Sequence, residues 1–172
     1  MNSPRPEMSA EEMRRHLAEV GERLAREGLT GEIVLAVGAV MVMALHARGG
    51  SRDIDAVFAT EGDAIREAVG RVAEANGLPA FWLNDHVRVF IAADAPTVEL
   101  FEVPGLRVRM VRLDYLFYMK AWAGDPGDQR DLRVIAEALA LVDEQQAHEL
   151  VRRYSQGELP REIQILIESL FE

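Results

Sequence analysis

The sequence predicts an α/β fold: a small mixed β-sheet of four to five strands with helices packed against it, followed by a helical C-terminal part. Two observations lead to this class. Before residue 112, short apolar segments bounded by glycine, proline or aspartate alternate with amphipathic segments. After it, the pattern is helical throughout. We therefore expect a single domain made of an N-terminal helix (1–30), a sheet core (31–111) and a helical part (112–172).

The N-terminal half begins with a helix that a capping-box signal predicts. Ser9 is followed three residues later by Glu12, and the amphipathic pattern runs to about Glu27, before Gly28. His16 lies among charged residues, and we interpret it as a surface histidine. Trp82 is interpreted as a core residue. The next elements are a strand at 32–37, a helix at 40–48, a strand that opens at 53 and a helix at 60–76.

The C-terminal half begins with more strands and continues with helices. Segments 87–92 and 97–103 predict a hairpin, because Asp94-Ala95-Pro96 between them suits a turn. A further strand is expected at 106–111. The remaining patterns predict helices at 113–123, 132–141, 144–154 and 160–171.

Composition restricts the classes of function. A chain of 172 residues can bury a sizeable core, and the absence of cysteine excludes disulfides and thiolate metal sites. The N-terminus lacks the apolar core of a signal peptide, and no run approaches the roughly 18 apolar residues of a membrane span. We therefore expect a soluble cytoplasmic protein without a membrane partner.

The charge of the chain argues against broad binding to nucleic acid. The formal net charge is −10, from 19 basic and 29 acidic residues, whereas affinity for nucleic acid comes largely from neutralised phosphates. Segment 104–133, however, is net +2. This segment either faces phosphates or forms a solvated surface, and the sequence leaves both readings open.

The stretch Gly31–Phe58 contains the candidate metal-binding and phosphate-binding residues. It predicts a strand, a glycine turn at Gly38, a short helix and a second strand that opens with Asp53 and Asp55. Residues two apart on a strand share a face, so the two carboxylates lie close and repel each other unless a cation separates them. Oxygen ligands of this kind suit Mg²⁺ or Mn²⁺ together with substrate phosphates. Gly38 and the helix start behind it suit a phosphate.

This pattern resembles the core of the polymerase-β-type nucleotidyltransferase superfamily, and most closely the small bacterial proteins related to the AbiEii and MenT toxins. The superfamily pattern is an apolar strand, Gly-Gly or Gly-Ser, a helix, and then Thr/Ser-Arg/Lys-Asp-x-Asp. Here it is read in Val37-Gly38-Ala39 and Ser51-Arg52-Asp53-Ile54-Asp55. The resemblance covers roughly residues 33–141.

The resemblance implies transfer of a nucleoside monophosphate from an NTP to an acceptor, with pyrophosphate leaving. Asp53, Asp55 and a third carboxylate from a later strand would hold the metal. Glu99, flanked by apolar residues, is the preferred third ligand, with Glu102 in reserve and the open sheet face as the alternative for Glu99. The residues implied to bind the nucleotide are Gly38, Ala39, Ser51, Arg52 and Lys120.

A lysine followed by an aspartate-bearing helix also belongs to the resemblance. Lys120 is the single lysine of the chain, and the resemblance implies that it neutralises the leaving pyrophosphate. Otherwise it would be an ordinary exposed helix lysine. Asp131 is the matching aspartate, which would hold Lys120 or Arg130 or line the acceptor site. For Asp128 we favour a helix cap over catalysis.

The acceptor, and whether the chain is an enzyme at all, remain open. The acceptor would be a tRNA end, a protein hydroxyl or a small molecule, in the manner of a toxin or of a housekeeping enzyme. Alternatively, the chain is a catalytically silent member that binds a partner protein as a toxin–antitoxin component or sensor. Ala39 supports this alternative, because alanine lacks the hydroxyl that the superfamily often has there. A structural domain with a coincidental Asp-x-Asp ranks last.

Overall fold

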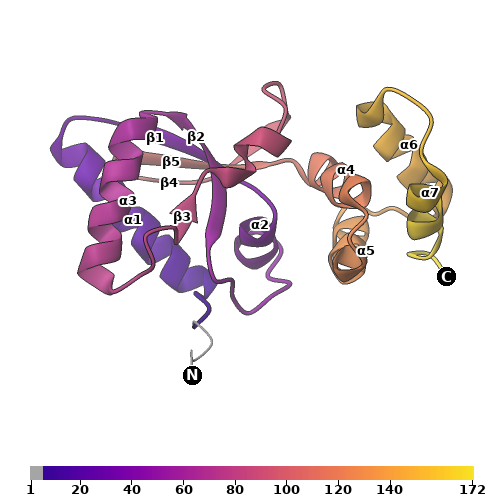
Figure 1. Cartoon of the computed structure of the whole chain (residues 1–172), viewed down its shortest axis with the longest axis horizontal. Coiled ribbons are helices and arrows are strands. Elements are labelled where there is room, and N and C mark those ends of the chain that lie inside the picture. Colours follow the sequence, from indigo (N-terminus) through magenta and orange to yellow (C-terminus); the bar gives the residue numbers. More distant parts are fainter. Residues whose placement is uncertain (1–5) are drawn as a thin grey trace. The chain divides into compact units, whose positions relative to one another are not determined.

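The predicted α/β fold is confirmed by the computed structural model, which describes residues 6–172 and contains a mixed five-stranded sheet (Figure 1). The chain divides into two units, Met1–Val111 and Arg112–Glu172. The division falls where the sequence pattern changes from alternating strands and helices to helices alone.

The first unit holds the sheet, whose strand order is β3-β2-β1-β5-β4. Neighbours β1–β2 and β4–β5 are antiparallel, whereas β1–β5 and β2–β3 are parallel. The strands are β1 (Gly31–Leu35), β2 (Ile54–Thr60), β3 (Leu83–Asn84), β4 (Thr97–Val103) and β5 (Leu106–Val111); the helices are α1 (Ala10–Arg26), α2 (Gly38–Met43), α3 (Gly62–Asn76) and the 3-10 helix η1 (His86–Phe90).

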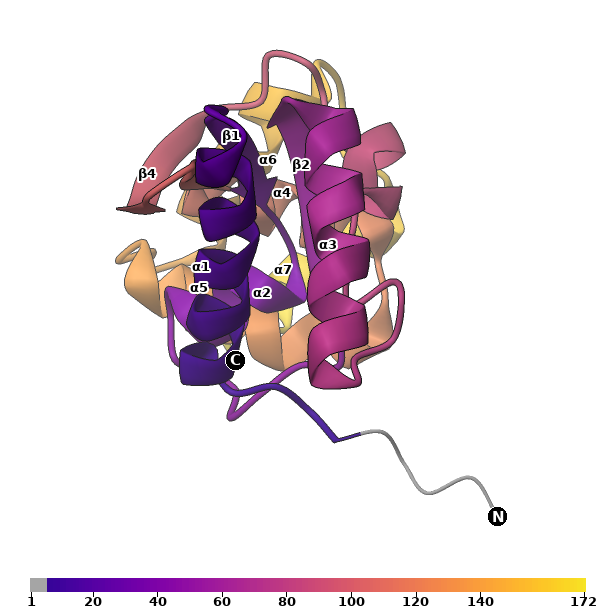
Figure 2. The same cartoon turned by 90° about the vertical axis from the view of Figure 1, so that its left-hand side faces the viewer.

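Helices α1 and α3 lie side by side against one face of the sheet (Figure 2). Strand residues that point to this face, among them Ile33, Leu35 and Ile54, are fully buried. The predicted capping box at the start of α1 is present: Glu12 N–H donates to Ser9 Oγ at 3.2 Å, and Ser9 N–H donates to Glu12 Oε2 at 2.8 Å. Trp82 is fully buried, as predicted.

Two predictions in the N-terminal half are wrong. His16 is not a surface residue: it is 4% exposed and packs edge-to-face on Trp82, with ring centroids 5.6 Å apart. It shares the buried face of α1 with Met13 and Val20. The helix expected at 40–48 is instead α2, which begins at Gly38 and ends at Met43.

The strand predicted at 87–92 is also wrong, and with it the hairpin to 97–103. This segment forms η1, because Asn84 Oδ1 accepts the His86 N–H at 3.2 Å and Arg88 N–H donates to the Asp85 carbonyl at 3.1 Å. Such local bonds compete with strand pairing. Strand β4 pairs with β5 instead, through a two-residue turn in which Gly105 has φ +78°.

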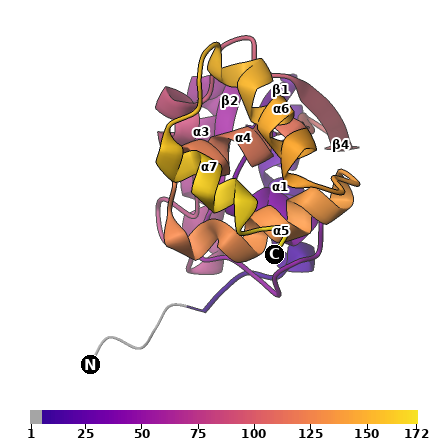
Figure 3. The same cartoon turned by 90° about the vertical axis from the view of Figure 1, so that its right-hand side faces the viewer.

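The second unit consists of helices (Figure 3). They are α4 (Leu113–Ala123), α5 (Gln129–Ala138), α6 (Glu144–Ser155) and α7 (Arg161–Glu168), with the 3-10 turn η2 (Pro126–Asp128) before α5. Tyr154 of α6 donates a hydrogen bond to Asp114 of α4 at 2.8 Å. Burial and this carboxylate raise the pKa of Tyr154 to about 12. Among the described residues, no helix is long and apolar enough to cross a bilayer.

Candidate metal and nucleotide site

The paired aspartates lie where β2 begins. Asp53 immediately precedes the strand and Asp55 is its second residue. Along β2, Ile54, Ala56 and Phe58 are buried, whereas Asp55 and Val57 are half-buried. This alternation places Asp55 on the sheet face opposite to α1 and α3.

The pKa of Asp55 reflects the closeness of the two aspartates. Burial, and then the negative charge of Asp53, raise the pKa of Asp55 above its ordinary value of 3.8. A hydrogen bond with the Asn84 side chain and the charge of His86 act in the opposite direction. Within the described range, neither aspartate forms an ion pair with a protein cation. The fold therefore holds two like charges together without a lysine or arginine of the described residues paired to either of them.

The glycine turn lies beside this pair on the neighbouring strand. Ala36 N–H donates to the Asp55 carbonyl at 3.0 Å, so Val37 and Gly38 follow directly beyond the start of β2. Val37 has φ +51° and ψ −120°, a conformation that costs a β-branched residue on the order of 1–3 kcal/mol. Strain of this kind is concentrated at binding and catalytic sites.

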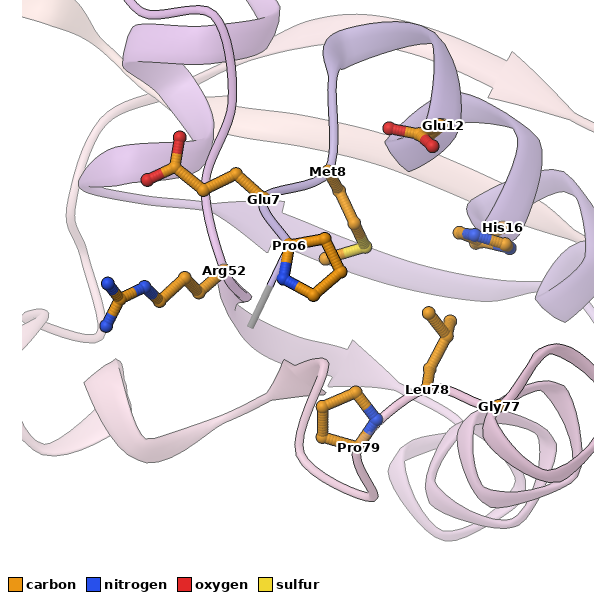
Figure 4. A pocket seen from close by; sticks show the side chains of 9 residues that line it. All are labelled: Pro6, Glu7, Met8, Glu12, His16, Arg52, Gly77, Leu78 and Pro79. Atoms are coloured by element: carbon orange, nitrogen blue, oxygen red, sulfur yellow. The ribbon is translucent and has the colours of Figure 1, made fainter. Parts of the chain in front are cut away.

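The other predicted nucleotide-binding residues separate into two groups. A Cβ added at Gly38 would lie 3.5 Å from Ser51 Oγ, so the Ser51 hydroxyl faces the turn. Ala39 is 1% exposed, and its methyl group belongs to the core. Arg52 lies elsewhere: it lines a pocket of about 470 Å³ together with residues from the N-terminal segment, α1 and the end of α3 (Figure 4).

The predicted third carboxylate does not join the pair. Strands β1 and β5 lie between β2 and β4, which separates Asp55 from Glu99 by roughly 14 Å at the usual strand spacing. The Glu99 side chain is 83% exposed and lies 3.8 Å from the Arg109 guanidinium. Glu102, the reserve residue, faces Arg107 at 3.5 Å. Glu99 thus occupies the open sheet face, which was the alternative interpretation.

Lys120 and its aspartates form a separate cluster in the second unit. The side chain is 4% exposed, and its Nζ lies 2.7 Å from Asp128 Oδ1 and 2.9 Å from Asp131 Oδ2. Lys120 is therefore not the ordinary exposed lysine. Asp128 occupies the N-cap position of α5, but its side chain makes no capping hydrogen bond and binds Lys120 instead. The cluster connects α4 to η2 and α5.

The basic segment 104–133 is largely neutralised by the protein itself. Arg107 and Arg109 face glutamates of β4, and Arg112 Nη2 lies 2.6 Å from Asp114 Oδ2. Lys120 is buried between its two aspartates. These contacts favour the reading of the segment as an internally paired surface over a reading as a phosphate-binding face.

Sequence reasoning missed Asn84 and Arg48. Asn84 lies on β3 in register with Asp55, is 8% exposed, and its amide donates to the Phe81 carbonyl at 3.2 Å. A buried polar residue at the end of an apolar segment was the available signal. Arg48 lies in the loop before β2, and its Nη1 lies 4.0 Å from the position of a Cβ on Gly38.

The donor set at β2 fits a divalent cation bound partly through substrate. Two carboxylates suit Mg²⁺ or Mn²⁺ when phosphate oxygens and water complete the ligand sphere. In the part of the chain that the structure describes, no group of three or more His, Cys, Asp or Glu side chains is arranged to hold a metal. No family model matches the chain, and no curated protein or solved structure is significantly similar to it.

Proposed function

We propose that this protein binds a nucleoside triphosphate with Mg²⁺ or Mn²⁺ at the start of β2 and transfers the nucleoside monophosphate to an acceptor, with pyrophosphate leaving. The observation that supports this most is the Asp53–Asp55 pair, two like charges held next to the glycine turn with neither carboxylate in an ion pair with a lysine or arginine of the described residues. A cation supplied with the substrate would relieve their repulsion.

Each residue of the site has a defined task in this proposal. Asp53 and Asp55 hold the ion, and Asn84, in register with Asp55 on β3, lowers the pKa of the Asp55 carboxyl. When bound, the ion neutralises the triphosphate and lowers the pKa of the attacking hydroxyl. Gly38 allows a phosphate to approach the backbone, and Ser51 offers its hydroxyl to a phosphate oxygen.

The proposal assigns a structural role to Lys120. Its charge is balanced by Asp128 and Asp131, so contact with the pyrophosphate would require it to leave two buried carboxylates. Catalytic roles for Lys120 and Asp131 remain predictions of the resemblance. The pairing of the arginines in segment 104–133 favours a protein hydroxyl or small molecule over RNA as the acceptor.

A second candidate is a catalytically silent protein that binds a partner protein, such as an antitoxin or sensor. The position of Glu99 favours it, because a site with two carboxylates lacks the third ligand that the resembled enzymes use. Ala39, without a hydroxyl in the turn, favours it as well.

Thermal unfolding with each of the four NTPs, with and without Mg²⁺, distinguishes the two candidates. A ligand present at about 100 times its dissociation constant stabilises the folded state by about 2.7 kcal/mol. We expect a Mg²⁺-dependent increase in the unfolding midpoint that Asp53→Ala abolishes and the control Glu99→Ala retains. The absence of any such increase with all four NTPs would reject nucleotide transfer in favour of partner binding.

A further inference from the structure

The loop between α2 and β2 places the guanidinium of Arg48 near the glycine turn. A Cβ added at Gly38 would meet Ser51 Oγ at 3.5 Å and Arg48 Nη1 at 4.0 Å. Because glycine has no such atom, the hydroxyl and the guanidinium face the same uncovered point of the backbone. An oxygen near this point is within reach of both donors.

Backbone hydrogen bonds brace the loop at both ends and fix the backbone from which Arg48 and Ser51 extend. Ala47 N–H donates to the Met41 carbonyl of α2 at 2.9 Å. Ser51 and Met8 exchange two backbone hydrogen bonds of 2.8 and 3.0 Å. A Cβ at Gly50 would lie 2.8 Å from the Met8 carbonyl oxygen, which excludes larger residues and fixes how closely these segments approach. A backbone braced in this way loses little conformational freedom when a ligand binds.

Arg52, which the sequence motif singles out, is directed elsewhere. It lines the pocket of Figure 4 with Glu7, Glu12 and His16, and these residues come from the N-terminal segment and α1. Ser51 and Arg52 are consecutive residues, and the Ser51 hydroxyl is the one that faces Gly38. The arginine beside the glycine turn is therefore Arg48.

We propose that Arg48 binds the terminal phosphates of the triphosphate, together with Ser51 and the backbone at Gly38. This inference rests on the proposed function. A guanidinium presents paired N–H donors that match phosphate oxygens, and such charge-assisted bonds are among the strongest in proteins. The turn lies directly beyond Asp55, so a triphosphate whose cation is bound by the carboxylates would have its terminal phosphates on the side of Arg48.

Calorimetric titration of the full chain with inorganic tripolyphosphate in Mg²⁺ tests this assignment. Arg48→Ala is expected to weaken binding by about 10- to 100-fold, the usual effect of losing a hydrogen bond to a charged group. Arg48→Lys should retain part of the affinity, and the matched control Arg52→Ala should bind as the wild type does. Titration of each variant with Mn²⁺ alone should give wild-type affinity, because the carboxylates are unchanged.

Gly38→Ala provides a second variant that leaves both arginines in place. Its added methyl group would fill the space in front of Ser51 at an ordinary contact distance, so the fold should persist while tripolyphosphate binding weakens. Wild-type affinity in Arg48→Ala, or an equal loss in Arg52→Ala, would overturn the role of Arg48 and leave the proposed function standing. A wild-type chain that binds neither tripolyphosphate nor any NTP with Mg²⁺ would overturn both.

Discussion

Two clusters of charged residues in this protein differ in their charge balance: one holds like charges, and the other pairs a lysine with two aspartates. At the start of β2, burial and the like charge of Asp53 raise the pKa of Asp55. In the second unit, Lys120 lies between Asp128 and Asp131 at 2.7 and 2.9 Å. In the first cluster no lysine or arginine pairs with the carboxylates among the described residues, whereas the second cluster contains its own cation. The difference indicates that the first is suited to binding and the second to holding helices together.

The largest expected effect comes from removing the cation of the second cluster. Lys120→Met removes the ammonium that lies 2.9 Å from the carboxylate of Asp131, a residue that is 4% exposed. Breaking a buried ion pair in this way costs about 3–5 kcal/mol of unfolding free energy. Urea unfolding measures the loss, and Arg130→Met, at an exposed neighbouring position, should stay within about 0.5 kcal/mol of the wild type. A loss below about 1 kcal/mol would contradict the structural role.

A substitution in the first cluster should instead increase the free energy of unfolding. Asp55→Asn removes a carboxylate that burial and Asp53 destabilise, so the metal-free protein should become more stable, by up to about 1 kcal/mol because the group is only half-buried. Urea unfolding in a chelator checks this. The same variant should no longer be stabilised by Mg²⁺ with an NTP. A destabilised variant would show that Asp55 serves the fold instead.

The pH dependence of this effect follows from the direction of the pKa shift. The pKa of Asp55 is raised in the folded state, so the folded protein binds more protons than the unfolded chain between 3.8 and the raised value. Relative to Asp55→Asn, wild-type stability should therefore be highest below pH 3.8 and decrease as the pH rises through the folded pKa. Unfolding of both proteins between pH 3 and 7 in a chelator provides the test. A difference that stays constant would contradict the shift.

The smallest effect is expected at the residue that does not join either cluster. Glu99 is exposed and lies 3.8 Å from Arg109, so Glu99→Gln should change the unfolding free energy by at most about 1 kcal/mol. Affinity for Mn²⁺ should equal that of the wild type. Reduced Mn²⁺ affinity in this variant would place Glu99 among the ligands and revise the two-carboxylate site.

The part of the site that sequence reasoning predicted depends on local spacing. Asp53 and Asp55 lie two residues apart at the start of β2, and Lys120 and Asp131 lie on the neighbouring helices α4 and α5. Glu99 could not be placed in this way, because its distance from Asp55 depends on strand order. The parallel pairing of β1 with β5 inserts two strands between them, and no local pattern encodes that pairing.

For one of the remaining differences, the burial of His16, the sequence contained a signal that our prediction did not use. His16 lies at helical spacing from Met13 and Val20, which predicts burial on the face that packs on Trp82. Arg48 had no such signal, because its position beside Gly38 depends on how the loop is braced. The turn at 86–90 depends on the Asn84 side chain, which is not visible in a propensity pattern.

Paramagnetic broadening by Mn²⁺ of the backbone amide signals of the ¹⁵N-labelled full chain tests the central contrast most directly. The carboxylate pair at β2 should localise the ion, so we predict that substoichiometric Mn²⁺ broadens signals at residues 36–38, 51–56 and 83–86. The same addition to Asp53→Asn should leave these signals sharp. Unchanged broadening of these signals in the variant, or no broadening of them in the wild type, would contradict the account.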